Sequence, residues 1–324
     1  MTGATGFIGS ALVRRLRAAN VPVRALGRPR PVVVSDDVVR IDLTSGPLDP
    51  ALLDGIDVVF HLAAKTHDLA DSGEGEAAFE KINIDGTRHV LNAARATNVR
   101  RFVFVSSVKA QDEGGPDQRD ETHTPQPSTP YGRSKLAAER LVLAAADAGG
   151  PAGVCLRFPI VYGPGQKGNL ARMIAAIERG RFPPPPGNSN RRSMLHVENA
   201  VDALILAGQH DGAAGQTYFV TDAEPYSTRQ IFDWIREAMG KPPVRWSVPL
   251  WVFRALATIG DASRAVIGRR IGFDSEALQK LLGSAWYSPA RIVNELGYAP
   301  RHDLHGAIPD LLAEHQRALP GRPA

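Results

Sequence analysis

The sequence has few of the features that define disulfide-rich, membrane-spanning and nucleic-acid-binding proteins. It has a single cysteine, Cys155, in an apolar run, so no internal disulfide can form and we expect a strand-core residue in a reducing cytoplasm. The apolar stretch 249–260 is interrupted by Arg254 and is too short to span a bilayer. We expect a packed helix there, with a partner-binding or membrane-contacting helix as the alternative.

Basic residues do not gather into a nucleic-acid-binding run. Lys and Arg total 38 against 34 Asp and Glu, and the basic pairs lie apart without interleaved aromatics. His196 has no metal-ligating cluster beside it, so no metal is expected. The chain opens on a glycine-rich loop and not on a secretory leader, which agrees with a cytoplasmic protein.

Strand-like and helix-like runs alternate in the first half, which indicates a parallel sheet wrapped by helices. The predicted strands are 21–26, 32–34, 58–62, 102–106 and 153–158, and the predicted helices are 10–19, 79–97 and 134–146. With 324 residues available, we expect an α/β, Rossmann-type doubly wound domain over residues 1–160. Residues 161–324 should form mainly a smaller, discontinuous substrate lobe, part of which returns to the sheet.

Three glycines near the start have the spacing of a pyrophosphate-binding turn. Gly3, Gly6 and Gly9 lead into an apolar helix, where the backbone can approach a phosphate and helix N–H groups can bind it. The strand that should precede this turn is missing, and Met1 stands where its last residue belongs, in the middle of the sheet. We therefore expect the stated start to be internal to the natural chain.

Tyr131 and Lys135 are the strongest catalytic signal in the chain. Four residues apart on a helix, the two side chains project from the same face. A nearby ammonium lowers the pKa of a phenol from its ordinary value of about 10, which makes proton transfer at neutral pH possible. The pair predicts an acid/base centre.

With these motifs the chain resembles the extended short-chain dehydrogenase/reductases, also called the NAD-dependent epimerase/dehydratase family. The matching segments are Thr2–Gly9, Asp42-Leu43, 61–64, 83–87, 104–107, Tyr131 with Lys135, and 157–164. The segments 106–109 and 190–193 are most similar to the UDP-glucose 4-epimerase-like subgroup. Ile160 departs from the family, which often has Asn there, and no second phosphate-binding arginine is identifiable.

The resemblance implies a role for each residue of the candidate site. Tyr131 would be the acid/base, and Lys135 would lower its pKa and hold the nicotinamide ribose. Ser107, in preference to Ser106, would hydrogen-bond the reacting oxygen, and Asn83 would support a proton relay. The implied cofactor-binding residues are Gly3, Thr5, Gly6, Phe7, Ile8, Gly9, Arg28, Asp42, Leu43, Leu62, Ala63, Ala64, Tyr131, Lys135 and Phe158. The implied substrate-binding residues are Lys65, Ser107, Val108, Asn169 and Arg192.

The choice between NAD and NADP depends on the end of the second strand. An Asp or Glu there would bind the adenosine ribose of NAD. Gly27 occupies that place and Arg28 follows it, which favours the 2′-phosphate of NADP. Arg28 could also be a solvated loop residue or stack on adenine.

The leading hypothesis is a nucleotide-sugar oxidoreductase that moves hydride at sugar C4 through bound NAD(P). The most specific form is a UDP-hexose or UDP-N-acetylhexosamine 4-epimerase, and the alternative is an NADPH-dependent 4-keto-sugar-nucleotide reductase. A steroid or flavonoid ketone reductase and a non-catalytic dinucleotide-binding assembly subunit also stay open. Dehydratase chemistry is disfavoured because 106–109 lacks an Asp-Glu pair. The resemblance also implies a homodimer.

Overall fold

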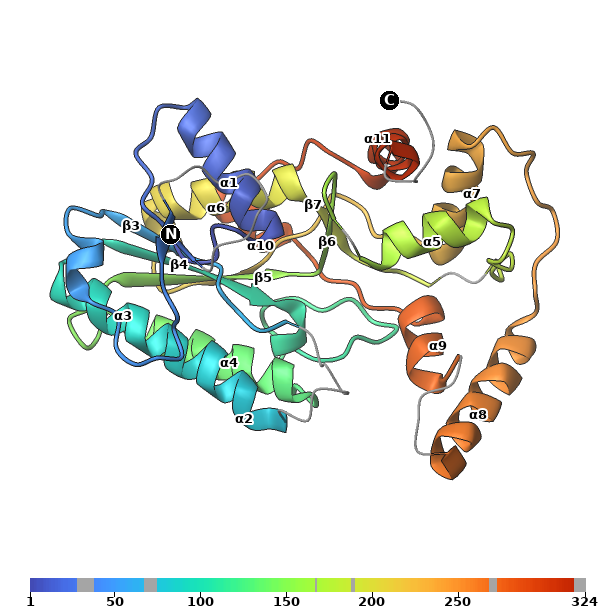
Figure 1. Ribbon diagram of the computed structural model, residues 1–324, viewed down its shortest axis with the longest axis horizontal. Coiled ribbons are helices and arrows are strands. Elements are labelled where there is room, and N and C mark those ends of the chain that lie inside the picture. The colour runs from blue at the N-terminus through green and yellow to red at the C-terminus, as the bar shows by residue number, and fades with distance from the viewer. Residues whose placement is uncertain (28–37, 67–74, 167, 188–189, 268–272, 318–324) are drawn as a thin grey trace.

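A parallel sheet runs through the centre of the molecule. The computed structural model describes residues 1–27, 38–66, 75–166, 168–187, 190–267 and 273–317 (Figure 1). The strands, in spatial order, are β2 (Val38–Arg40), β1 (Ala25–Gly27), β3 (Val58–His61), β4 (Arg101–Ser107), β5 (Ala152–Phe158) and β8 (Thr217–Phe219). The predicted strand 32–34 lies outside the described residues.

Residues 1 and 2 hold the position between β1 and β3. Thr2 pairs in parallel with both Leu26 and His61. The Leu26 amide donates to the Met1 carbonyl over 2.7 Å, and the Thr2 amide donates to the Phe60 carbonyl over 3.0 Å. Met1 therefore lies at the central place expected for it, and the strand order is that of a Rossmann sheet.

Helices cover both faces of the sheet, as the alternating pattern predicted. On one face α1 (Phe7–Ala18) and α6 (Val197–Gln209) bury apolar residues such as Leu12 and Leu204. On the other face α3 (Gly86–Ala96) and α4 (Pro130–Leu143) bury their own set (Figure 1). Cys155 is fully buried in β5, so the expectation of strand core is confirmed.

Several element boundaries differ from the prediction. Of the predicted strand 21–26 only 25 and 26 pair, and β1 continues to Gly27, because the chain first makes a left-handed turn at Asn20 and leaves Val21 exposed. The predicted helix 79–97 is divided into α2 (Gly75–Phe79), a π-helical segment (Glu80–Asp85) and α3. Short 3₁₀ turns cover Pro50–Leu53, Val108–Ala110 and Asp211–Ala213.

The C-terminal part adds helices beyond the end of the sheet. Two short strands, β6 (Ile160–Tyr162) and β7 (Met194–His196), pair in parallel. The core beyond them is formed mainly by α5 (Asn169–Glu178), α7 (Thr228–Ala238) and α11 (Leu304–Arg317). The remaining helices are α8 (Leu250–Ile267), α9 (Ser275–Leu282) and α10 (Ala290–Leu296).

Helix α8 packs on α9 and leaves its other face open. Phe253 and Ala257 are buried, and Phe253 contacts the ring of Phe273. Trp251 is 70% exposed and Ile259 is 63% exposed. The expected packed helix is thus present with one apolar face uncovered. Among the described residues, no helix has the length and apolarity needed to cross a membrane.

Candidate active site

The glycine turn brings the start of α1 close to the sheet. Gly3 has a φ of 71°, and a Cβ there would lie 2.7 Å from the Ala63 amide nitrogen. A Cβ on Gly9 would collide with the Gly3 carbonyl oxygen. Gly6 is the N-cap of α1 and has no side chain, so the first backbone amides of the helix receive no hydrogen bond from a capping side chain. Backbone packed this closely, at a helix N-terminus, fits a dinucleotide pyrophosphate.

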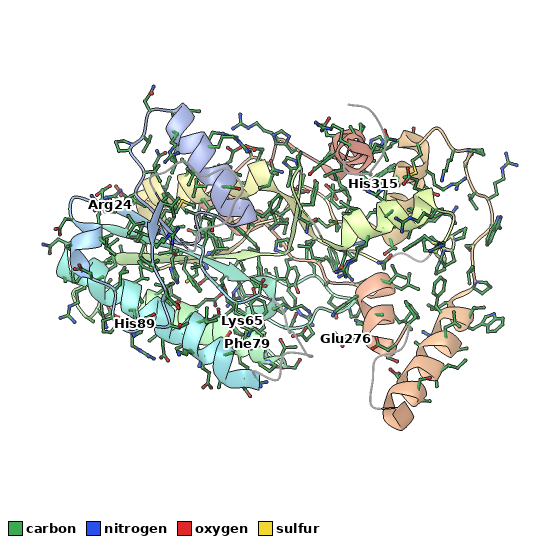
Figure 2. The ribbon with its side chains drawn as sticks, in the orientation of Figure 1. Arg24, Lys65, Phe79, His89, Glu276 and His315 are labelled. Atoms are coloured by element: carbon green, nitrogen blue, oxygen red, sulfur yellow. The ribbon has the colours of Figure 1, made fainter. Side chains whose placement is uncertain are left out.

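The adenine side of the predicted groove is described only in part. Leu43 is buried against Gly86, and its carbonyl lies 3.2 Å from His89 Nδ1 (Figure 2 labels His89). Asp42 is exposed and accepts hydrogen bonds from the amide and hydroxyl of Thr44. Gly27 ends β1, whereas Arg28 lies outside the described residues.

Asn83 ties the segment after β3 to the helix that carries Tyr131. Its Oδ1 accepts from the Lys65 amide over 2.8 Å, and its Nδ2 donates to the Lys65 carbonyl and to Ser134 Oγ. Ser134 Oγ in turn donates to the Tyr131 carbonyl. Asn83 is 1% exposed and lies in the π-helical segment, an irregularity often found at functional sites.

Lys65 lies at the edge of this network. Its Nζ is 5.7 Å from the centre of the Phe79 ring, and Figure 2 shows the two side chains close together. Phe79 also lies 6.1 Å from the Tyr131 ring, centre to centre. Leu62, Ala63 and Ala64 connect β3 to Lys65 and are all half-buried.

Tyr131 and Ser107 meet at the carboxyl end of β4. Ser107, the last residue of β4, is the side chain that lowers the pKa of Tyr131, and Thr129 caps α4 so that Tyr131 is its second residue. Gly132 permits this approach, because a Cβ there would collide with the Lys109 carbonyl. Ser106 instead donates to Glu139 over 2.5 Å. Of the two serines, the structure places Ser107 next to the phenol.

Burial raises the pKa of Tyr131, and its hydrogen bond with Ser107 acts in the opposite direction. Lys135 is not among the causes of this shift in the structure described, so its effect on the pKa of Tyr131 stays a prediction. Lys135 is 2% exposed, and its Nζ donates to the Val105 carbonyl over 2.6 Å and lies 4.0 Å from the centre of the Phe104 ring. Burial lowers the pKa of Lys135 to about 7, while Glu139 opposes that shift. The lysine shares the helix face but turns into the core.

Glu139 and Arg157 form a buried ion pair beneath this site that the sequence did not predict. Arg157 donates to both carboxylate oxygens of Glu139, over 2.9 and 2.7 Å, and also to Gln111 Oε1. Glu139 follows Lys135 by four residues on α4, so an extension of the Tyr131-Lys135 spacing would have found it. The ion pair joins α4 to β5. Phe158, the next residue of β5, is buried and is the register partner of Ser107 on the neighbouring strand β4.

Arg192 lies in the segment before β7, among chain segments far apart in sequence. It pairs with Tyr226 and with Ala285, and its guanidinium donates to the carbonyls of Gly283 (2.9 Å) and Gln279 (3.5 Å). Burial lowers its pKa. Among the described side chains no carboxylate forms an ion pair with Arg192, so its charge is available to an anion.

The other predicted substrate residues are placed as follows. Val108 is buried and begins the turn after Ser107, where it packs with Phe219. Asn169 is exposed at the first position of α5. His196 is buried, accepts from the Glu198 amide and stacks on His302, as a structural residue would. No group of three or more metal-ligating side chains occurs among the described residues.

Comparison with known proteins identifies the class of protein to which this fold and the Tyr131–Ser107 site belong. The chain belongs to the NAD dependent epimerase/dehydratase family, whose model matches residues 1–221. It is 29% identical over 314 residues to a UDP-glucose 4-epimerase of Vibrio cholerae, covering 94% of this chain and 91% of that one.

Two further similarities extend this result. The chain is 32% identical over 314 residues to a 4-hydroxy-2-methyl-3-oxo-4-farnesyl-3,4-dihydroquinoline-1-oxide ketoreductase of Stigmatella aurantiaca, covering 93% and 91% of the two chains. It superposes on the solved structure of MoeE5 in complex with UDP-glucose and NAD with a TM-score of 0.75, 28% identity and 98% coverage of both. The expected family, the Rossmann-type sheet and an enzyme of the short-chain dehydrogenase type are confirmed.

Proposed function

We propose that the protein is a nucleotide-sugar oxidoreductase acting at sugar C4, most specifically a UDP-hexose or UDP-N-acetylhexosamine 4-epimerase. The observation that carries this proposal is the placement of Tyr131, in the first turn of α4, where Ser107 at the carboxyl end of β4 acts on its pKa. Ligands of open α/β sheets bind at this edge, and the glycine turn precedes α1 at the same edge. Residues 1–160 would bind the dinucleotide, and 161–324 would mainly bind the sugar nucleotide.

Each residue of the site has its own role in the proposed reaction. A bound nicotinamide supplies the hydride acceptor and donor. Tyr131 Oη exchanges a proton with the sugar O4, and Ser107 Oγ holds that oxygen in place. Asn83 fixes the start of α4 through Ser134, which keeps the phenol in position. Lys135 would serve as the ribose-binding residue after turning from the Val105 carbonyl.

Arg192 supports a diphosphate substrate. Its guanidinium is half-buried and donates to main-chain carbonyls, and burying a charge without a counter-charge is unfavourable. A diphosphate would provide that counter-charge and could accept two parallel hydrogen bonds. The solved relative that holds UDP-glucose supports the same class of substrate.

A second candidate function is an NADPH-dependent ketone reductase, including the 4-keto-sugar-nucleotide reductase. The raised pKa keeps Tyr131 a phenol at neutral pH, which suits proton donation to a ketone. The ketoreductase of Stigmatella aurantiaca favours this candidate as well. Gly27 supplies no carboxylate for the ribose of NAD, so NADP stays a proposal, whereas the solved relative contains NAD.

One experiment separates these functions. The dinucleotide that copurifies should be identified, and UDP-sugars should then be assayed with and without added NADPH. We expect retained dinucleotide and interconversion of C4 epimers without external reductant. Stoichiometric NADPH consumption would identify a reductase. Absence of both reactions would favour the non-catalytic subunit. Sedimentation would test the proposed homodimer.

A further inference from the structure

Tyr287 has a buried hydroxyl with no hydrogen-bond partner among the described residues. The residue is 2% exposed, and its Oη makes no hydrogen bond. Its backbone is held on both sides, because the Tyr287 amide donates to Ser193 Oγ over 2.9 Å and the residue pairs with Arg119. The ring is therefore fixed, and only the hydroxyl is left unsatisfied.

The other buried tyrosines show how unusual this is. Tyr162 and Tyr226 donate to Asp222, Tyr218 donates to Glu295, and Tyr298 donates to the Thr221 carbonyl. A buried hydroxyl without a partner destabilises the folded state. A phenylalanine would avoid that cost while keeping the packing, so the hydroxyl indicates a partner that comes from outside the chain.

The position of Tyr287 points to the nature of that partner. Its ring lies 4.9 Å from the Phe219 ring, centre to centre, in the same small cluster as Val108, the residue after Ser107. Burial raises the pKa of Tyr287, and its electrostatic neighbours include Arg192 as well as Asp112 and Glu113. The side chain thus lies between the end of β4 and the proposed diphosphate arginine.

We propose that Tyr287 is a positioning residue for the nucleotide-sugar substrate, an assignment that rests on the proposed function. Its hydroxyl donates a hydrogen bond to a substrate oxygen between the sugar carbon at Tyr131 and the phosphates at Arg192. The Arg192 guanidinium donates to main-chain carbonyls of 279 and 283, so a diphosphate can recruit it without breaking an ion pair.

The test is Tyr287→Phe, which removes only the hydroxyl. We expect the KM for the nucleotide sugar to rise about fivefold to tenfold, because a hydrogen bond contributes about 1 kcal/mol. The kcat and the affinity for dinucleotide should change less than about twofold. The unfolding temperature of the substrate-free variant should stay equal or rise, since a buried unsatisfied group is lost.

Tyr298→Phe is the matched control. It removes a buried hydroxyl that already donates to the Thr221 carbonyl over 3.1 Å, so it should lower the unfolding temperature and leave KM unchanged. If Tyr287→Phe raises stability with an unaltered KM on a sugar-nucleotide substrate, the positioning role is wrong and the proposed function stands. If wild-type protein turns over no nucleotide sugar, both proposals fail.

Discussion

The two walls of the candidate site are held by different kinds of contact. The sheet wall carries Ser107 and Tyr131 on β4 and α4, and β4 pairs with β5 over seven consecutive residue pairs, from Arg101 with Ala152 to Ser107 with Phe158. The opposite wall carries Arg192 and Tyr287, and it is held by isolated pairs among segments near 119, 192, 226 and 285. We infer that the sheet wall keeps the reacting group in place, while the other wall adapts to the substrate.

The largest expected effect is on the sheet wall. Tyr131→Phe should lower turnover by roughly 100-fold or more, because a positioned acid/base contributes about 10²–10⁴-fold. The affinity for dinucleotide, measured by titration, should be kept. Unchanged turnover in this variant would remove the acid/base role and leave the non-catalytic subunit as the better hypothesis.

The rigidity of the sheet wall can be tested through the buried ion pair of Arg157 with Glu139. Arg157→Met should lower the free energy of unfolding by about 3 kcal/mol, because it leaves the Glu139 carboxylate buried without its partner. Chemical denaturation gives this value. The exposed pair of Lys280 with Glu276 is the control, and Lys280→Met should cost less than about 1 kcal/mol. Equal losses would mean that the two walls do not differ in this respect.

On the adaptable wall, Arg192→Met should raise the KM for a UDP-sugar about tenfold or more. The reason is that hydrogen bonds to charged groups contribute about 1.5–3 kcal/mol each. Arg191 is the neighbouring control, since its exposed guanidinium lies on the Trp286 ring, and Arg191→Met should change KM less than about threefold. A KM that responds equally to both variants would contradict the diphosphate role.

A further expected effect is a loss of stability in acid, which arises from two buried histidines, His61 in β3 and His196 in β7. Burial lowers the pKa of His61 to about 3 and that of His196 to about 4, the latter with help from His302, against an ordinary value of 6.5. The unfolded chain therefore takes up protons first. Stability is fully present above pH 6.5 and falls as the pH drops toward 4, by up to about 1.4 kcal/mol per pH unit for each histidine.

Denaturation curves between pH 7 and pH 4 measure this loss. His61→Gln and His196→Gln should each flatten the dependence by about half. The exposed His305 is a suitable control, and His305→Gln should leave the slope as it is. A slope that survives both core substitutions would show that other groups govern acid unfolding.

The sequence predicts the sheet wall better than the opposite wall for a physical reason. Gly3 and Tyr131 belong to short motifs whose geometry is local, so their spacing is enough to identify them, and the family resemblance indicates Ser107. The direction of Lys135 was missed because it depends on the Val105 carbonyl and the Phe104 ring, which are tertiary contacts. Tyr287 had no local signal, because its surroundings come from segments about 70 to 180 residues away.

The positions of the tryptophans make it possible to follow one wall of the site by its own spectroscopic signal. All four, at positions 234, 246, 251 and 286, lie in the C-terminal third of the chain, and none lies in the sheet. Trp246 and Trp251 are 63% and 70% exposed, while Trp286 is next to Tyr287 and beneath the Arg191 guanidinium. Tryptophan fluorescence therefore reports on the C-terminal side of the molecule alone, and circular dichroism reports on the helices and sheet of the whole molecule in the same cuvette.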